Sequence, residues 1–117
     1  KENDFCMIHI EAPDETGHEG DYKKKMQAID DLDKKVVGPI VEGLRDKYDD
    51  YKICIVSDHP TPVELRTHSY EYVPYLIYNS KLNTCNHNQK VFSERSASES
   101  GVVIENGFEL LGHFFKK

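Results

Sequence analysis

The sequence lacks long apolar runs and a leader-like beginning, and each absence excludes a class of protein. The longest uninterrupted apolar stretches span only a few residues, such as residues 53–56, whereas about 20 are needed to cross a bilayer. No membrane-spanning segment is therefore predicted. No basic segment followed by an apolar one opens the chain, so nothing in these residues directs secretion and a cytoplasmic protein is expected.

Cysteines and clusters of positive charge are also scarce. The three cysteines, Cys6, Cys54 and Cys85, are odd in number, and two of them lie in apolar, strand-like runs. We therefore predict reduced, structural thiols and no disulfide framework. Acidic side chains outnumber basic ones by 21 to 15, which gives a net charge of −6. Nucleic acid is not an expected partner, because binding to phosphate backbones demands a clustered basic surface.

The chain does have the length and the apolar patterning of one small α/β domain. Its 117 residues leave little room for two independently cored domains. Apolar runs at residues 4–11, 51–57 and 73–78 predict three strands, with Pro74 near the start of the third. The order strand, helix, strand predicts a right-handed crossover onto a parallel sheet.

The remaining segments predict helices and surface loops. Apolar residues recur at spacings of three and four over residues 22–44, which predicts an amphipathic helix capped by Asp21 and interrupted at Gly38-Pro39. Residues 12–21 and 79–100 are read as loops, the first because of Pro13 and two glycines and the second because it is polar. Residues 105–115 predict a terminal helix.

Five acidic and histidine residues fall in the loops that follow the first two predicted strands. They are Asp14 and His18 after the first, then Asp58, His59 and His68 after the second. The carboxyl ends of parallel strands meet at one edge of a sheet, so these side chains are expected to converge. Carboxylates and imidazoles are natural ligands of Zn²⁺ or Mn²⁺. Taken singly, Asp14 is better explained as shaping a turn and His18 as a solvated side chain. It is the set as a whole, with the stiffening prolines on both sides of Thr61, that favours a metal site.

Longer segments around these residues resemble a known family. The segments are HIEAPDETGHEGD, KVVGPIVEGL, DHPTPVELRTHSYEYVPYLIY and FSERSASESG. Together they resemble the cofactor-independent phosphoglycerate mutases of the archaeal type, members of the alkaline phosphatase superfamily. The resemblance spans nearly the whole chain and keeps an Asp-x-x-x-His motif, an Asp-His pair and a later histidine in order.

The resemblance implies a glycolytic enzyme with two divalent metal ions, which Mn²⁺, Zn²⁺, Mg²⁺ or Co²⁺ would suit. It implies that Asp14, His18 and His68 hold one ion and that Asp58 and His59 hold part of the second. It also implies a three-layer fold in which helices flank a mainly parallel sheet. The reaction would interconvert 2-phosphoglycerate and 3-phosphoglycerate by phosphoryl transfer through a serine.

No segment of this chain matches the family's nucleophilic serine, the aspartate that completes the second ion, or the inserted substrate-binding domain. The resemblance therefore implies that residues 1–117 are a C-terminal part of the metal-binding domain, inactive alone. Arg66 is read as a weak candidate for substrate phosphate, with a structural role beside Glu64 or Asp58 preferred. Thr61, between two prolines, is read as a rigid turn residue and not as a nucleophile.

Two alternative functions stay open at this point. Another phosphotransferase of the same superfamily, such as a phosphatase, a phosphopentomutase or a homoserine-kinase-like enzyme, would keep the same ligands. A metal-binding module without chemistry would keep them too. A sheet that lacks its neighbouring strands exposes an edge and an apolar face, so the isolated chain is expected to form a homodimer or to be marginally stable.

Overall fold

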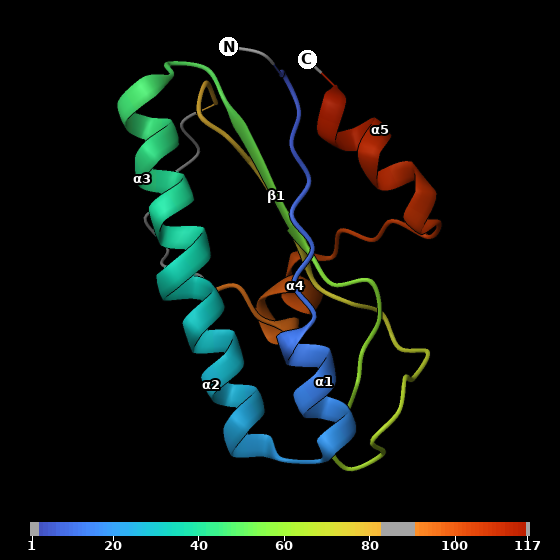
Figure 1. The fold of residues 1–117 in the computed structure, drawn as a ribbon. Coiled ribbons are helices and arrows are strands. Elements are labelled where there is room, and N and C mark those ends of the chain that lie inside the picture. The colour runs from blue at the N-terminus through green and yellow to red at the C-terminus, as the bar shows by residue number, and fades with distance from the viewer. Residues whose placement is uncertain (1–2, 83–90, 117) are drawn as a thin grey trace. The chain divides into compact units, whose positions relative to one another are not determined.

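The computed structural model describes residues 3–82 and 91–116 (Figure 1). The chain divides into two compact units, and each is described by itself. The first unit contains Lys1–Ile40 and Pro60–Tyr70, and the second contains Val41–His59 and Glu71–Lys117. Helices and strands are both present, so the predicted α/β composition is confirmed in its mixed form.

The first unit begins with an extended segment and a helix where a strand and a loop were predicted. Residues 5–11 form no strand, because a strand requires a ladder of backbone hydrogen bonds to another strand, and the described residues form no such ladder with this segment. Helix α1 then spans Ala12–Glu19, so the prediction of a loop was wrong. Pro13 lies in the first turn, where a missing N–H costs nothing, and Gly20 ends the helix with a left-handed φ of 73°.

The amphipathic helix and its interruption are confirmed. Helix α2 spans Tyr22–Leu32, and the Asp21 carboxylate accepts hydrogen bonds from the backbone N–H groups of Lys23 and Lys24. A π-helical turn, η1, covers Asp33–Val37, and helix α3 follows at Gly38–Lys47 without an intervening loop. Pro39 has no N–H to donate four residues back, and a wider turn directly before it makes room for its ring.

The second unit contains the two strands, and they pair antiparallel. Strand β1 spans Lys52–Val56 and strand β2 spans Tyr75–Asn79, close to the predicted ranges. In their register Lys52 lies opposite Asn79 and Val56 lies opposite Tyr75. The predicted crossover would instead have paired residues 4–11 with residues 51–57 in parallel, and the described residues contain no such pair, because residues 5–11 form no strand. The segment between β1 and β2 contains no helix and reverses the direction of the chain, as an antiparallel pair requires.

The end of the chain is more helical than predicted. Helix α4 spans Glu94–Ser100, inside the stretch predicted to be irregular, because the Ser93 hydroxyl caps its first turn by accepting from the Ser96 N–H. The predicted terminal helix is confirmed as a 3-10 turn, η2, at Gly107–Glu109 and helix α5 at Leu110–Phe115. Cys85 lies outside the described residues, whereas Cys6 and Cys54 are free thiols, as predicted.

Neither unit has a deep core. In the part of the chain that the structure describes, no hydrophobic side chain is fully buried, and Thr61 is the buried polar residue at 4% exposure. None of the described helices is long and apolar enough to cross a membrane. In the first unit, where the candidate site lies, side-chain hydrogen bonds therefore do much to hold the segments in position.

Candidate metal centre

Three of the predicted ligands meet in the first unit. Asp14 and His18 lie four residues apart on α1, a spacing that places both side chains on one face of a helix. His68 belongs to the segment Pro60–Tyr70 of the same unit. The two segments that supply these ligands are about 50 residues apart in the sequence, so the fold and not the local sequence brings them together.

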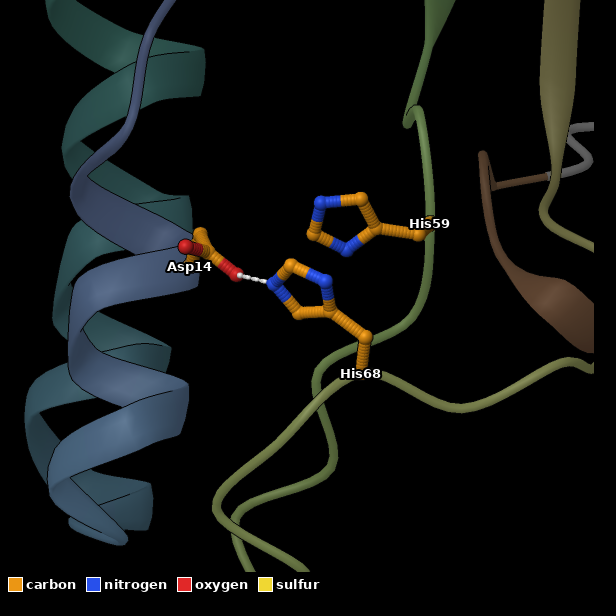
Figure 2. A group of neighbouring side chains, drawn as sticks. All are labelled: Asp14, His59 and His68. Carbon is orange, nitrogen blue, oxygen red and sulfur yellow. Dashed lines mark ion pairs between the residues drawn. The ribbon is translucent and has the colours of Figure 1, made fainter.

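The three side chains meet at nearly equal distances. Asp14 Oδ1 lies 3.3 Å from His68 Nε2, the ion pair drawn in Figure 2. Asp14 Oδ2 lies 3.3 Å from His18 Nε2, and the two Nε2 atoms are 3.2 Å apart. Ligands of a tetrahedral ion with bonds of about 2.0–2.1 Å are separated by about 3.3 Å. The spacing therefore fits a small divalent ion held by the Asp14 carboxylate and two imidazole nitrogens, with a different carboxylate oxygen facing each ring.

The tautomer of His18 follows from its second ring nitrogen. His18 Nδ1 lies 3.0 Å from the backbone carbonyl oxygen of Arg66. A carbonyl only accepts, so Nδ1 carries the proton in this hydrogen bond. In the neutral ring Nε2 then presents its lone pair toward Asp14 and His68, which is the orientation that a metal ligand requires.

The loop that carries His68 is fixed by several hydrogen bonds. The Ser69 N–H donates to the Pro60 carbonyl at 3.2 Å, and the Arg66 N–H donates to the Pro62 carbonyl at 2.9 Å. Arg66 adopts a left-handed φ of 54°, a conformation that is uncommon for a residue with a side chain. This backbone turn directs the Arg66 carbonyl to His18, whereas the predicted pairing of the Arg66 side chain with Glu64 or Asp58 stays a prediction. The predicted role of Arg66 toward substrate also stays a prediction.

Sequence reasoning missed two further contacts of this site. The Thr61 hydroxyl donates to Asp14 Oδ1 at 2.5 Å, and Lys25 Nζ donates to the Thr61 carbonyl at 2.5 Å. These partners are 47 and 36 residues apart, and no local spacing links them. The only sequence signal was the pair of prolines on either side of Thr61, which indicated a rigid segment but not what it contacts.

The site is open to solvent. The side chains of Asp14, His18 and His68 are 36%, 42% and 49% exposed. An ion can therefore reach the three ligand atoms without any rearrangement of the first unit. One carboxylate and two imidazoles form a donor set of borderline hardness, suited to Zn²⁺ or Mn²⁺. Asp14 and His68 are also members of an Asp/His group of the described residues that could hold a metal ion.

Asp58 and His59, the predicted ligands of a second ion, follow β1 in the second unit. The His59 N–H donates to Asp58 Oδ1 at 3.0 Å, and His59 Nε2 lies 3.4 Å from Asp58 Oδ2. This pair is therefore held locally by bonds between adjacent residues. Its role in binding a second ion stays a prediction.

The comparisons with known proteins agree with a metal-binding role. The chain is 40% identical over 93% of its length to a probable 2,3-bisphosphoglycerate-independent phosphoglycerate mutase of Geobacter sulfurreducens. It is 42% identical over 92% of its length to a 2,3-bisphosphoglycerate-independent phosphoglycerate mutase of Methanothrix thermoacetophila. The matched region covers 27% of each of these relatives.

No solved structure is significantly similar to the chain. The sequence profile described as the Metalloenzyme superfamily matches residues 1–103, which include all five predicted ligands. The chain therefore belongs to the Metalloenzyme superfamily.

Proposed function

We propose that this chain forms part of a 2,3-bisphosphoglycerate-independent phosphoglycerate mutase and supplies one metal centre of its phosphoryl-transfer site. The observation that carries the proposal is the meeting of Asp14, His18 and His68 at 3.2–3.3 Å. Its support comes from membership of the Metalloenzyme superfamily and from the mutases that the chain resembles. Phosphoglycerate is the proposed substrate of the whole enzyme.

Each residue has a defined task in this proposal. Asp14 supplies a negative charge that offsets part of the charge of a divalent ion, and His18 and His68 supply neutral nitrogen donors. Asp58 and His59 contribute to a second ion. Divalent ions in such sites stabilise the attacking and leaving oxygens of a phosphoryl displacement. No residue of this chain matches the family's nucleophilic serine, so the chain alone is expected to be inactive.

The proposal also extends to the fold. The relatives are almost four times as long as the matched region, and the family resemblance implies that this region is the C-terminal part of a metal-binding domain. We propose that β1 and β2 belong to a larger, mainly parallel sheet flanked by helices in three layers. The whole of residues 1–117 would then form one part of a single domain.

Metal titration tests the first step of the proposal. Calorimetric titration of Zn²⁺ and of Mn²⁺ into the metal-stripped chain is expected to show saturable binding near one ion per chain, lost in His68→Ala. The control is His113→Ala, which removes an exposed imidazole of α5 in the second unit. Absence of saturable binding, or equal losses in the two variants, would contradict the metal centre.

A chimeric enzyme tests the reaction. The segment of the Geobacter sulfurreducens relative that matches this chain is replaced by residues 1–117, and interconversion of 2-phosphoglycerate and 3-phosphoglycerate is assayed. Mutase activity that is lost with Asp14→Asn would support the proposal. A folded, metal-binding chimera that only releases phosphate would point to another phosphotransferase. One that binds metal without any phosphoryl transfer would point to a non-catalytic module.

We further propose that the isolated chain associates as a homodimer through its exposed sheet surface. Val56 of β1 and Leu76 of β2 are exposed apolar residues of the antiparallel pair, and unpaired strand edges favour such association. Light scattering coupled to size-exclusion chromatography is expected to give twice the chain mass. A monomer at all accessible concentrations would contradict this part of the proposal.

A further inference from the structure

Thr61 combines features that a simple turn residue does not need. It is the buried polar residue of the described chain, at 4% exposure, although it lies in a segment flanked by prolines. Its hydroxyl donates to the carboxylate of Asp14, and its carbonyl accepts from Lys25 Nζ. The hydroxyl and the carbonyl of this residue are therefore both used, the hydroxyl on a proposed metal ligand.

We propose that Thr61 is a positioning residue, whose hydroxyl fixes the Asp14 carboxylate in the orientation in which it binds a divalent ion together with His18 and His68. This inference rests on the proposed function, because it concerns the same metal centre. It goes beyond that function by assigning a task to a residue that is not itself a ligand.

The chemistry of a carboxylate explains why such a partner is needed. The terminal torsion of an aspartate side chain is broad, so the direction of its lone pairs is poorly defined without a donor. The hydrogen bond from Thr61 to Asp14 Oδ1 is 2.5 Å long, in the short range of hydroxyl donors to charged carboxylates. This hydrogen bond uses one lone pair of Oδ1. It does not involve Oδ2, the oxygen that lies 3.3 Å from His18 Nε2.

Several neighbours fix the hydroxyl in turn. The prolines on both sides restrict the backbone of Thr61, and Lys25 Nζ holds its carbonyl. Helix α1 approaches closely because residue 17 is glycine. A Cβ at this position would lie 2.5 Å from the Thr61 carbonyl oxygen and 2.8 Å from its Cγ2. The hydroxyl is thus placed by groups on three separate segments of the first unit.

The test uses three variants of the metal-stripped chain. Thr61→Val removes the hydroxyl and keeps the branched shape, whereas Thr61→Ser keeps the hydroxyl. Thr16→Val is the matched control, because the Thr16 hydroxyl donates to the Ala12 carbonyl within the same helix as Asp14 and touches no proposed ligand. Affinity for Zn²⁺ is measured by calorimetry, and the visible absorption of bound Co²⁺ reports ligand geometry.

Thr61→Val is expected to weaken Zn²⁺ binding by about 10- to 100-fold, the usual effect of removing the partner of a ligand. Its Co²⁺ spectrum is expected to shift, while Thr61→Ser restores both readouts and Thr16→Val changes neither. Far-UV circular dichroism verifies that each variant is folded. If Thr61→Val does not fold, Thr61→Ala, which also lacks the hydroxyl, takes its place in the comparison with Thr61→Ser.

The outcomes separate the two proposals. If the parent chain binds Zn²⁺ and Thr61→Val binds it equally well with the same Co²⁺ spectrum, the positioning role is overturned and the metal centre stands. If Thr61→Ser binds as weakly as Thr61→Val, packing of the methyl group and not the hydroxyl is responsible, and the role is again overturned. If the parent chain itself does not bind, the proposed function fails, and this inference fails with it.

Discussion

The two units of this chain are stabilised by different kinds of contact. In the first unit, distant segments are joined by single side-chain groups, such as Thr61 on Asp14 and Lys25 on the Thr61 carbonyl. In the second unit, they are joined mainly by the backbone ladder between β1 and β2. Side-chain contacts there, such as the Tyr51 and Tyr78 rings with centroids 5.9 Å apart, add to that ladder.

This difference separates the two sets of predicted ligands. Asp14, His18 and His68 are brought together from two segments by the hydrogen bonds of the first unit. Asp58 and His59 are adjacent residues that contact each other. The proposed ligands of the first ion thus lie within a single unit, whereas two proposed ligands of the second ion lie in the second unit. Single substitutions are therefore expected to damage the first site most when they fall in the first unit.

The largest effect is expected from the ligands themselves. Asp14→Asn removes the charge that faces both histidines, and we expect Zn²⁺ affinity to fall by at least about 100-fold, the upper end of what even an indirect partner costs. Asp58→Asn in the second unit is the matched variant and is expected to leave the affinity little changed. Calorimetric titration of both chains measures this. Equal losses of Zn²⁺ affinity in Asp14→Asn and Asp58→Asn would contradict the proposed difference between the two units, because binding of the ion would then depend on both of them.

A pair of glycine substitutions compares the packing of the two units. Gly17→Ala in α1 forces a Cβ against the backbone and side chain of Thr61, and overpacking of this kind costs about 1–3 kcal/mol. Gly43→Ala in α3 meets no atom within 4 Å and is expected to stabilise its helix by up to about 1 kcal/mol.

Urea unfolding and hydrogen exchange, read segment by segment, measure these two changes. Exchange is expected to speed up in α1 of Gly17→Ala and to slow in α3 of Gly43→Ala. If Gly17→Ala were as stable as the parent chain, Thr61 would have room to move, and the close approach of α1 would not be what fixes it.

The elements that could be predicted from the sequence are those with a local cause. Helix α2 and strand β1 follow from apolar spacing that is contained within each segment, and the interruption before Pro39 follows from the missing N–H. The strand predicted at residues 4–11 failed because pairing depends on another segment. Helix α1 was missed because Pro13 and Gly17 were read as loop residues, although one suits a first turn and the other is required by Thr61.

The candidate site divides in the same way. The types and the order of the proposed ligands were visible in the sequence as an Asp-x-x-x-His motif followed by later acidic and histidine residues. The helix that places Asp14 and His18 on one face was not predicted, because this segment was read as a loop. The contacts of Thr61 and Lys25 were not visible, because they join residues 47 and 36 positions apart. The left-handed turn at Arg66, which directs its carbonyl to His18, also had no signal in residue type.

A second pair of glycines is expected to show a smaller difference. Gly20 and Gly101 both end helices with left-handed φ angles of 73° and 69°, so alanine at either costs about 1 kcal/mol in backbone strain. At Gly20 an added Cβ also overlaps the Arg66 guanidinium, whereas at Gly101 it meets nothing within 4 Å.

We therefore expect Gly20→Ala to be the more destabilising of the two and to weaken Zn²⁺ binding slightly, since the carbonyl of Arg66 orients His18. Gly101→Ala should leave Zn²⁺ binding unchanged. Thermal unfolding and calorimetry measure both effects. A loss of Zn²⁺ affinity in Gly101→Ala would show that the end of α4 influences the first unit, contrary to the comparison.

The smallest expected effect concerns the thiols, one in each unit. Cys6 in the first unit is exposed, whereas Cys54 on β1 is half-buried, and burial raises the pKa of the Cys54 thiol above its usual value. The thiolate is the form that reacts with alkylating agents, so Cys54 is expected to react several-fold more slowly than Cys6 with iodoacetamide near neutral pH. Its rate should keep rising toward alkaline pH as the thiolate forms.

Peptide mapping by mass spectrometry after timed alkylation distinguishes the two sites, and the same reaction in guanidinium chloride is the control, in which the folded environment of Cys54 is lost. The difference between native and unfolded chain then measures how well the strand pair protects its thiol. Equal native rates would mean that β1 and β2 open as readily as the extended segment at residues 5–11. In that case the backbone ladder would not protect the second unit from local opening better than the first unit is protected. The small amount of buried apolar surface in both units would then determine how readily each of them opens.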